Sequence, residues 1–570
     1  MLPFLLGGQS ARVNSPTPAI VAQSAVRRLP RLALLLFCAA YVIPGFVFRE
    51  PWKSADMTAF GYMFELARGG ADWLSPTLLG QPPDFNALLP YWLGAWAINW
   101  APAWLPADLA VRVVYAGLLV LTLLATWYAV YHLARGPGAQ PVPFAFGGEA
   151  HPTDYARAIA DGALLGLVAS LGLAQLSHET TPALAQLGFT ALTFYGLAAA
   201  PYHRWLPGLS LATGLAGLAL SGAPTLALAF AVGGAAVLVL DPPADAPSSE
   251  RSWGWTVALL AMVLGVALLA RELELWHWRL ESSRDWRSIG RLLLWFTWPT
   301  WPLALWTVWR WRRRLADRHV ALPLWFALVS LASTLSTTNA DRSLLLGLPA
   351  LAALAAFALP TLKRGVAALI DWFTLLFFSS CAIVIWVVWI SLQTGFPAKP
   401  ASNVYKLAPG FEPSFSLGAL LLALGGTVAW AWLVRWRTRR HQQPIWRSLV
   451  LPAGGAALCW LLMMTLWLPV LDYARSYTPV VRGLTQAMGP HPGCVEVFGL
   501  TRGQAAALRY HAGLDLHSAG TRPQCGWLVV APGVEASAAV AMQMKQWKPV
   551  AKVRRPTDAN DNLLLYRKAP

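Results

Sequence analysis

Charged side chains are scarce in this chain. Only 12% of its 570 residues are Asp, Glu, Lys or Arg, whereas 56% are hydrophobic. Soluble globular proteins carry about 25% charged residues, so this composition excludes an ordinary soluble domain. It also excludes intrinsic disorder, because a chain this apolar does not stay unfolded in water. Five cysteines are too few for a disulfide scaffold, and the glycines lack the three-residue period of collagen.

Several enzyme motifs are also missing. The chain has no Walker loop, no Cys-x-x-Cys pair, no His-Glu-x-x-His and no Gly-x-Ser-x-Gly. These absences argue against phosphate-loop chemistry and against a metal held by cysteine. Any chemistry must then come from carboxylates, histidines and arginines.

Long apolar runs fill most of the chain instead. A bilayer core about 30 Å thick needs about 20 apolar residues in a helix. By that measure about thirteen segments are candidate spans. They are 32–48, 111–134, 158–177, 182–200, 206–222, 225–240, 253–270, 292–309, 321–337, 344–362, 368–392, 417–434 and 449–471. The sequence therefore predicts an all-α polytopic membrane protein with about 13 transmembrane helices.

The net charge of +17 is best explained by topology. Basic runs at 310–314 and 435–440 lie in alternate short loops, and the N-terminal segment is basic too. The positive-inside rule assigns these segments to the cytoplasm. We expect a bacterial inner-membrane protein with a cytoplasmic N-terminus and a periplasmic C-terminus. With 31 tryptophans as interfacial anchors, its partners should be membrane lipids and not nucleic acid.

This topology divides the chain into three parts. Residues 1–31 form a cytoplasmic N-terminus, and 32–472 form the transmembrane region, which includes a first periplasmic loop at 49–110. Residues 473–570 form a soluble periplasmic domain. The first span follows arginines without a small-residue cleavage site, so we expect an uncleaved anchor.

Apolar residues recur at helical spacing from Met57 to Ala67 in the first loop. This pattern predicts an amphipathic helix lying at the membrane interface. The alternative is a solvated loop whose apolar stripe rests on the helix bundle.

The tail has strand-like runs at Val495–Leu500, Trp527–Val530 and Leu563–Tyr566, with a helix expected at 502–512. Alternation of this kind predicts a small α/β domain. Its two cysteines, Cys494 and Cys525, would lie in an oxidising compartment, where a disulfide is expected. The alternative is two unpaired thiols.

Asp56 is the first candidate for catalysis. A carboxylate just beyond the first span lies where the dielectric falls, which suits activation of a hydroxyl or binding of a metal beside a phosphate. Glu50 lies close enough in sequence to share the site, and Lys53 is a candidate phosphate ligand. The alternative for Asp56 is a helix cap.

His178 and Glu179 form the short outer turn between the third and fourth spans. A polar pair at that depth is a candidate base, metal ligand or phosphate partner. The alternative is an ordinary hairpin turn that leads into a proline at the start of the next helix.

Arginines near the outer face are candidate ligands for a lipid phosphate. Arg279, Arg284 and Arg287 alternate with tryptophans in the segment 271–291, which violates the charge rule. Arg342 opens the tenth span and could clamp a polyprenyl phosphate. The alternatives are a self-neutralised amphipathic helix at 271–291 and a snorkelling anchor at Arg342.

Four stretches of the first loop form a recognisable pattern. They are 56–60 (Asp-Met-Thr-Ala-Phe), 70–76 (Gly-Ala-Asp-Trp-Leu-Ser-Pro), 80–82 (Gly-Gln-Pro) and 90–95 (Pro-Tyr-Trp-Leu-Gly-Ala). Together with Arg342–Pro349, they resemble the motifs of GT-C glycosyltransferases, in particular the aminoarabinose transferase and protein mannosyltransferase group. The layout of spans, first outer loop and C-terminal outer domain is also similar.

The resemblance implies transfer of a sugar from a polyprenyl-phosphate-linked donor to a lipid, glycan or protein acceptor on the outer face of the membrane. Asp56 would assist the acceptor or a divalent metal. Asp84, His178 and Glu179 would be the metal ligands, because Asp84 lies next to the family's Glu position and the other two occupy the turn of its second Asp.

The chain also departs from the family pattern. Met57 replaces the family's second acid, and Phe85 and Asn86 stand where the family has Glu and Lys. Two functions therefore remain open: a divergent transferase with a rebuilt site, and a catalytically inactive member that binds polyprenyl lipid or acts as a scaffold.

Overall fold

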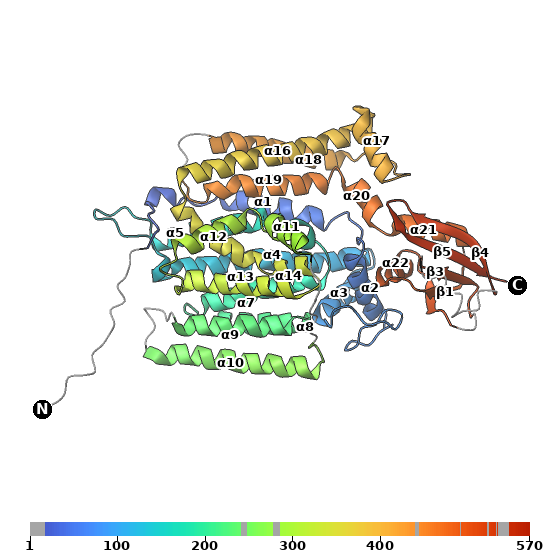
Figure 1. Ribbon diagram of the computed structural model, residues 1–570, viewed down its shortest axis with the longest axis horizontal. Helices are drawn as coiled ribbons and strands as arrows, with labels where there is room; N and C mark the ends of the chain where they lie inside the picture. Colours follow the sequence, from blue (N-terminus) through green and yellow to red (C-terminus); the bar gives the residue numbers. More distant parts are fainter. Residues whose placement is uncertain are drawn as a thin grey trace.

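The computed structural model describes residues 17–203, 205–240, 248–276, 285–438, 444–490, 492–520, 524–531, 533 and 546–569. The helices form an elongated bundle, with the C-terminal sheet domain at one end (Figure 1). The first eleven are α1 Arg31–Val42, α2 Ala55–Ala67, α3 Leu89–Trp100, α4 Ala107–Arg135, α5 Pro152–Ala169, α6 Leu173–Leu176, α7 Pro182–Ala199, α8 Trp205–Leu220, α9 Pro224–Leu240, α10 Ser248–Glu272 and α11 Trp286–Phe296.

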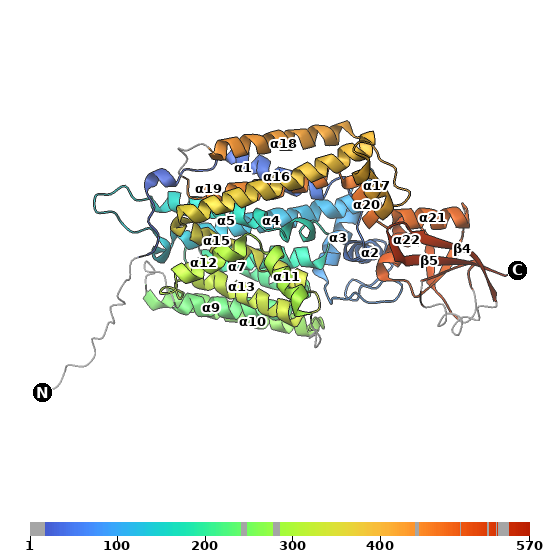
Figure 2. The same cartoon turned by 45° about the horizontal axis from the view of Figure 1, so that its top comes forward.

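The remaining helices complete the bundle and lead into the tail. They are α12 Thr300–Arg310, α13 Arg318–Ser336, α14 Ala340–Leu345, α15 Leu348–Ala358, α16 Arg364–Thr394, α17 Ala398–Leu407, α18 Leu417–Thr438, α19 Arg447–Met463, α20 Leu468–Arg475, α21 Thr478–Met488 and α22 Arg502–His511. In a second view, α16 and α18 lie along the outer edge, and α17 lies at the end that carries the sheet domain (Figure 2).

Each predicted span coincides with one helix or with two consecutive helices. Among the described residues, five helices are long and apolar enough to cross a membrane, or six if the bent pair α19–α20 is one span. These helices indicate a multi-pass membrane protein, whereas the total of about thirteen spans stays a prediction.

Helix starts follow from local sequence. Pro152 and Pro182 occupy the first positions of α5 and α7, where a missing backbone N–H costs nothing. Thr501 and Gln504 form a capping box at the start of α22. Gly395, with φ of 78°, ends α16 in the left-handed conformation that glycine adopts without strain.

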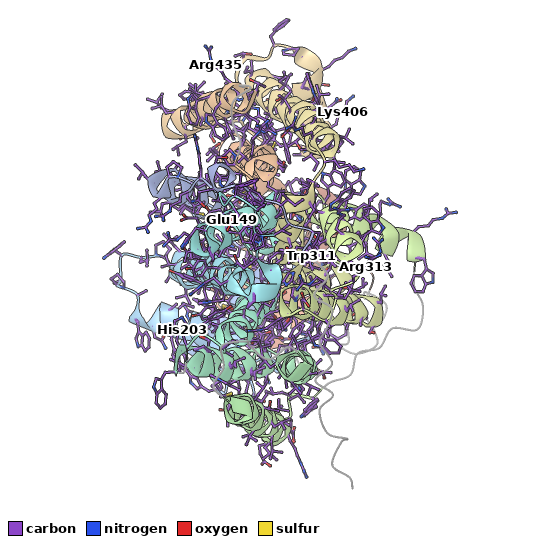
Figure 3. All side chains as sticks on the ribbon, turned by 90° about the vertical axis from the view of Figure 1, so that its left-hand side faces the viewer. Glu149, His203, Trp311, Arg313, Lys406 and Arg435 are labelled. Carbon is purple, nitrogen blue, oxygen red and sulfur yellow. A yellow bond between two sulfur atoms is a disulfide. The ribbon has the colours of Figure 1, made fainter. Side chains whose placement is uncertain are left out.

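The basic loops lie together at the end of the bundle away from the sheet domain. Viewed from that end, Figure 3 shows Glu149, His203 and Arg313, which belong to the loops after α4, α7 and α12. Arg435, near the end of α18, lies there too. The loops that follow α12 and α18 thus emerge at the same end of the bundle.

The tail folds into a five-stranded sheet with α22 beside it. The strands are β1 Cys494–Phe498, β2 Asp515–Ser518, β3 Trp527–Val530, β4 Trp547–Arg555 and β5 Asp558–Lys568, in the order β2-β1-β3-β5-β4. β1 is parallel to β2 and β3, and β5 is antiparallel to β3 and β4. The predicted small α/β domain is confirmed.

The helix predicted in the first loop is confirmed as α2, but protein covers it where the sequence suggested a membrane interface or a solvated loop. α2 is buried almost completely, and it packs against α3 on one side and α22 on the other. Gly61 permits this contact, because a Cβ there would lie 2.4 Å from the Cβ of Ala506. The apolar stripe thus docks the sheet domain, and Phe60, Leu508 and Val497 share one hydrophobic core.

Candidate functional site

The carboxylate of Asp56 lies in the first turn of α2 and accepts four hydrogen bonds. Arg49 Nη2 (2.6 Å) and the backbone N–H of Trp52 (3.1 Å) donate to Oδ2. The backbone N–H (2.8 Å) and hydroxyl (2.6 Å) of Thr180 donate to Oδ1. A carboxylate has about four lone-pair sites, so none is left for a metal or an acceptor hydroxyl.

Asp56 is also not a helix cap. α2 begins at Ala55, and the cap position belongs to Ser54, whose side chain makes no capping bond. The carboxylate instead joins the end of the first span to the turn before α7.

Arg49 has no exposed side-chain surface. Besides Asp56, it donates to the carbonyl of His178 at 2.8 Å, while its Nε and Nη1 have no hydrogen-bond partner among the described residues. Its guanidinium lies 4.5 Å from the ring centre of Trp52, and that of Arg475 lies 5.0 Å from the same ring. The indole N–H of Trp52 donates to Asp472 at 2.6 Å. Cation–π contacts and hydrogen bonds therefore fix the positions of these side chains around Asp56 and Trp52, a region called here the Asp56 corner.

His178 is fully buried between the rings of Phe46 and Trp460. Its Nδ1 contacts the carbonyl of Ala174, and its Nε2 lies 3.1 Å from the carbonyl of Tyr41. Burial lowers the pKa of His178 to about 3. Both ring nitrogens face backbone oxygens inside the core, and the neutral ring has one N–H to donate, so this imidazole is placed for packing and not as the metal ligand that the sequence suggested.

Glu179 and Arg342 lie close together beside the Asp56 corner. Arg342 Nη2 is 3.9 Å from Glu179 Oε2, and Gln175 donates to Glu179 Oε1 at 3.1 Å. Burial raises the pKa of Glu179, and the nearby charge of Asp56 raises it further. A carboxyl with a raised pKa next to a guanidinium is suited to proton transfer beside an anion.

Arg342 also lines a cavity of about 420 Å³. Apolar side chains of α9 and α13, such as Leu226, Trp325 and Val329, form much of its wall. Hydroxyl and amide side chains lie among the same lining residues: Asn86, Gln186, Ser333, Ser336, Thr337, Thr338, Asn339 and Ser343. The cavity thus combines an apolar wall with polar groups and the cationic side chain of Arg342, which suits a lipid with an anionic head group.

Two predicted site residues of the first loop contact the C-terminal segment instead. Lys53 pairs with Asp558 (2.6 Å) and Asp561 (3.0 Å) of β5. Asp84 forms an ion pair with Arg502 of α22. These charges hold the sheet domain against the first loop, so Lys53 and Asp84 are engaged by the C-terminal segment.

Glu50 is likewise engaged. Its Oε2 accepts a hydrogen bond from the hydroxyl of Thr478, at the start of α21. It points to the C-terminal segment and makes no bond to Asp56, so the two predicted catalytic acids do not form a pair.

The predicted arginine cluster of 271–291 is only partly covered. Arg279 and Arg284 lie outside the described residues. Arg287 is exposed in the first turn of α11 and is not among the lining residues of the cavity. Of the predicted phosphate ligands that the structure describes, only Arg342 lines it.

The residues present do not fit the divalent metal that the resemblance suggested. The ligand atoms of Asp56 and His178 are in contact with protein groups, Asp84 pairs with Arg502 through one carboxylate oxygen, and Glu179 accepts a hydrogen bond from Gln175. Within the described ranges, the one grouping of three potential ligands is Cys494, His517 and Cys525 in the sheet domain. There Cys494 and Cys525 form a disulfide with an S–S distance of 2.07 Å.

Sequence reasoning overlooked Arg49, Thr180 and Arg475. Arg49 was visible as a basic residue at the end of the first span, and Thr180 follows Glu179 directly. Arg475 carried no such signal, because only the fold brings α20 against Trp52.

No protein-family model matches the chain, and no curated protein matches it. Solved structures do match, and two of them are of one protein. ArnT from Cupriavidus metallidurans bound to undecaprenyl phosphate gives a TM-score of 0.61 at 15% identity, over 94% of this chain and 98% of that one. The same protein in the apo state gives 0.60 at 14% identity, over the same shares.

The chain has the GT-C fold. The likeness covers the bundle, the first loop and the sheet domain, since almost the whole of each chain is aligned. The fold expected from the loop motifs is therefore confirmed, whereas the GT-C likeness by itself assigns no residue a role.

Proposed function

We propose that this protein is a membrane glycosyltransferase that moves a sugar from a polyprenyl-phosphate donor to an envelope acceptor on the periplasmic face of a bacterial inner membrane. The single observation that carries the proposal is the cavity beside the Glu179–Arg342 pair. Support also comes from the GT-C fold and from the undecaprenyl phosphate bound to ArnT.

Arg342 is the proposed phosphate ligand. Its side chain is 22% exposed, so a ligand can reach it, and the apolar wall of α9 and α13 would hold the isoprenoid chain. A guanidinium fork binds phosphate oxygens in a bidentate way and stabilises the charge that develops on the leaving phosphate.

Glu179 is the proposed proton acceptor. The acceptor hydroxyl oxygen attacks the anomeric carbon, the bond from that carbon to the phosphate oxygen breaks, and the polyprenyl phosphate leaves with the bonding electrons. The hydroxyl proton passes to Glu179, whose raised pKa makes it a better base than an exposed carboxylate. Asp56 is a positioning residue, because it holds Thr180, the neighbour of Glu179.

The proposed topology follows from the grouping of the basic loops. The end of the bundle that carries Arg313 and Arg435 would face the cytoplasm, and the sheet domain would lie in the periplasm. The N-terminal segment 1–31, the transmembrane region 32–472 and the domain 473–570 remain our division of the chain.

A second function has one specific observation in its favour. Phe85 and Asn86 line the cavity where the family has Glu and Lys. A chain without those groups would suit a catalytically inactive protein that binds polyprenyl lipid or acts as a scaffold.

Purified full-length protein separates these two functions. It would be incubated with lipid-linked sugars extracted from envelope membranes. Two quantities would be measured: the lipid that stays bound to the protein, and the undecaprenyl phosphate that is released over time as the product of transfer. We expect the wild type to release it in the presence of an envelope extract, Glu179→Gln to bind without release, and Arg342→Ala to lose binding.

Glu412→Gln is the matched control, because Glu412 is exposed in the loop before α18. Binding without release by the wild type would favour the inactive lipid-binding protein. Release by Glu179→Gln at the wild-type rate would remove Glu179 from the mechanism.

A further inference from the structure

The parallel strands β1 and β2 bring four polar side chains to one face of the C-terminal sheet. In the register of the pair, Cys494 lies opposite Asp515, and Glu496 lies opposite His517. Side chains two apart on a strand share a face, and opposed residues share it too. Val495 and Leu516 point the other way, into the core. On this face Glu496 is buried and its Oε1 accepts hydrogen bonds from the backbone N–H groups of Gln524 and Cys525, whereas Asp515 and His517 are exposed.

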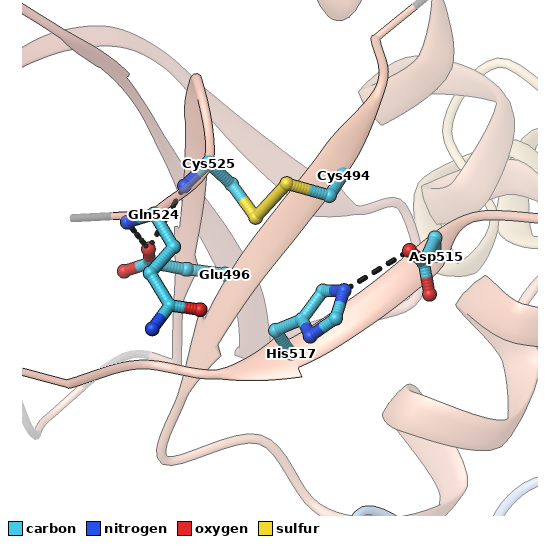
Figure 4. Close-up of a disulfide and its surroundings, with 6 residues drawn as sticks. All are labelled: Cys494, Glu496, Asp515, His517, Gln524 and Cys525. Atoms are coloured by element: carbon cyan, nitrogen blue, oxygen red, sulfur yellow. Dashed lines mark hydrogen bonds and ion pairs between the residues drawn. A yellow bond between two sulfur atoms is a disulfide. The ribbon is translucent and has the colours of Figure 1, made fainter.

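Cys525, just before β3, completes this group (Figure 4). The ligand atoms of Cys494, Cys525 and His517 all lie within 4.8 Å of one another. His517 Nε2 is 3.0 Å from Asp515 Oδ2, and the imidazole is about half exposed. A carboxylate that orients a histidine in this way is typical of the residues around a metal ligand.

We propose that this group is a metal site that forms when the disulfide is reduced, with Zn²⁺ as the preferred ion. Cys494, Cys525 and His517 supply three ligands, Asp515 orients the histidine, and water takes the fourth position. The chain is a transition-metal protein only in its reduced state.

The geometry supports this assignment. Zn²⁺ bonds of about 2.0–2.3 Å in a tetrahedron place ligand atoms about 3.5 Å apart. The three ligand atoms lie within 4.8 Å of one another, and the two sulfurs, which are bonded in the disulfide, have to move apart on reduction to reach that spacing. The Cα atoms of the two cysteines are 5.3 Å apart, so the sulfurs can separate by side-chain rotation alone.

The redox step balances with a dithiol reductant, protein-bound or small. The Cys494–Cys525 bond breaks, a new disulfide forms in the reductant, and its two thiol protons pass to the two protein sulfurs. Both protons leave when the thiolates bind Zn²⁺.

This site was not expected from the sequence, where the absence of Cys-x-x-Cys argued against a cysteine-bound metal. The histidine lies on a strand that the sequence analysis missed, so only the fold brings these ligands together. Neither Glu179 nor Arg342 takes part, so the site is independent of the proposed transfer.

The test uses the full chain in detergent, in the oxidised state and after reduction with a phosphine, with Co²⁺ and Zn²⁺ as probes. We expect reduced wild type to bind one Co²⁺ with the thiolate charge-transfer absorption of a tetrahedral site, and Zn²⁺ to displace it. Oxidised wild type should bind none. His517→Ala should weaken Zn²⁺ binding at least about tenfold, and Asp515→Asn should weaken it about tenfold.

The control is Cys494→Ser/Cys525→Ser, which keeps the three free cysteines of the bundle. Reduced wild type that binds no more metal than this control overturns the proposal. So does equal binding by the oxidised and reduced chains, or by His517→Ala and wild type. His517 is exposed, so its replacement leaves the core intact and the comparison stays informative.

Discussion

Arg49 and Asp56 form an ion pair of 2.6 Å in which the two side chains are 0% and 2% exposed. The pair joins the end of the first span to α2, and Thr180 joins it to the turn that carries Glu179. The residue that the family pattern marks for chemistry is thus fully engaged in holding three segments together.

Loss of Asp56 should therefore act mainly on stability. Asp56→Ala leaves the buried guanidinium of Arg49 without its counter-ion, which should cost about 3–5 kcal/mol. Thermal unfolding in detergent measures this, with Asp72→Ala, at an exposed position of the same loop, as the control. If Asp56→Ala were as stable as the control yet inactive, Asp56 would have a direct chemical role.

Chelation should leave transfer unchanged. The four donors around Asp56 and the two carbonyls around His178 occupy the atoms that would bind a divalent metal. The measurement is the rate of undecaprenyl phosphate release before and after dialysis against a chelator. A loss of rate that a divalent cation restores would contradict this prediction.

The pH dependence of stability should reflect the protonation of Glu179. Because its pKa is raised in the folded chain, the carboxyl favours folding below its unfolded pKa, and this contribution is lost as the pH rises through the folded pKa. Glu179→Gln should therefore raise the melting temperature at neutral pH and change it little at acid pH. Equal shifts at both pH values would show that the buried charge is not the cause.

The raised pKa of Glu179 also determines how the rate of transfer should depend on pH. A base must be deprotonated, so transfer should rise with pH through a value above that of an ordinary glutamate. Glu412→Gln should keep this limb of the profile. A wild-type rate that is already maximal at the pKa of an exposed glutamate would rule out Glu179 as the base.

Docking of the sheet domain should depend on Gly61. Gly61→Ala places a methyl group against Ala506 and should destabilise the chain by about 1–3 kcal/mol. Ala506→Gly in the same chain should restore much of the loss, whereas Ala506→Gly alone should not stabilise the wild type. Limited proteolysis of the tail reports the same contact, and failure of the second substitution to rescue would contradict it.

The sequence was most informative where apolar runs are long. Every predicted span contains helix, because a run such as that of α16 has no soluble alternative. α2 was misplaced for the opposite reason: an amphipathic pattern shows that one face is covered but not what covers it. Here the cover is α22, which lies more than 400 residues away along the chain.

The sheet domain shows the same limit on a smaller scale. β1 and β3 are short apolar runs and were predicted. β2 has four residues, three of them exposed, and β4 carries charged residues such as Lys548 and Lys552 among its apolar ones, so neither was predicted. Edge strands of this kind carry a weak hydrophobic signal. Among the candidate site residues, Asp56 and the 178–180 turn do lie together, as the sequence suggested. No sequence pattern shows which of these side chains is tied up in hydrogen bonds: Asp56 and His178 are, whereas Glu179 keeps a place beside Arg342.

The most direct test of the central claim is mass spectrometry of envelope glycolipids and glycoproteins from cells with the wild-type chain, without it, and with Arg342→Ala. Our account predicts that one sugar-bearing species is present with the wild type, is absent without the chain and is strongly reduced with Arg342→Ala, while Arg287→Ala leaves it unchanged. An identical set of glycolipids and glycoproteins in the presence and absence of the chain would contradict the proposed transfer.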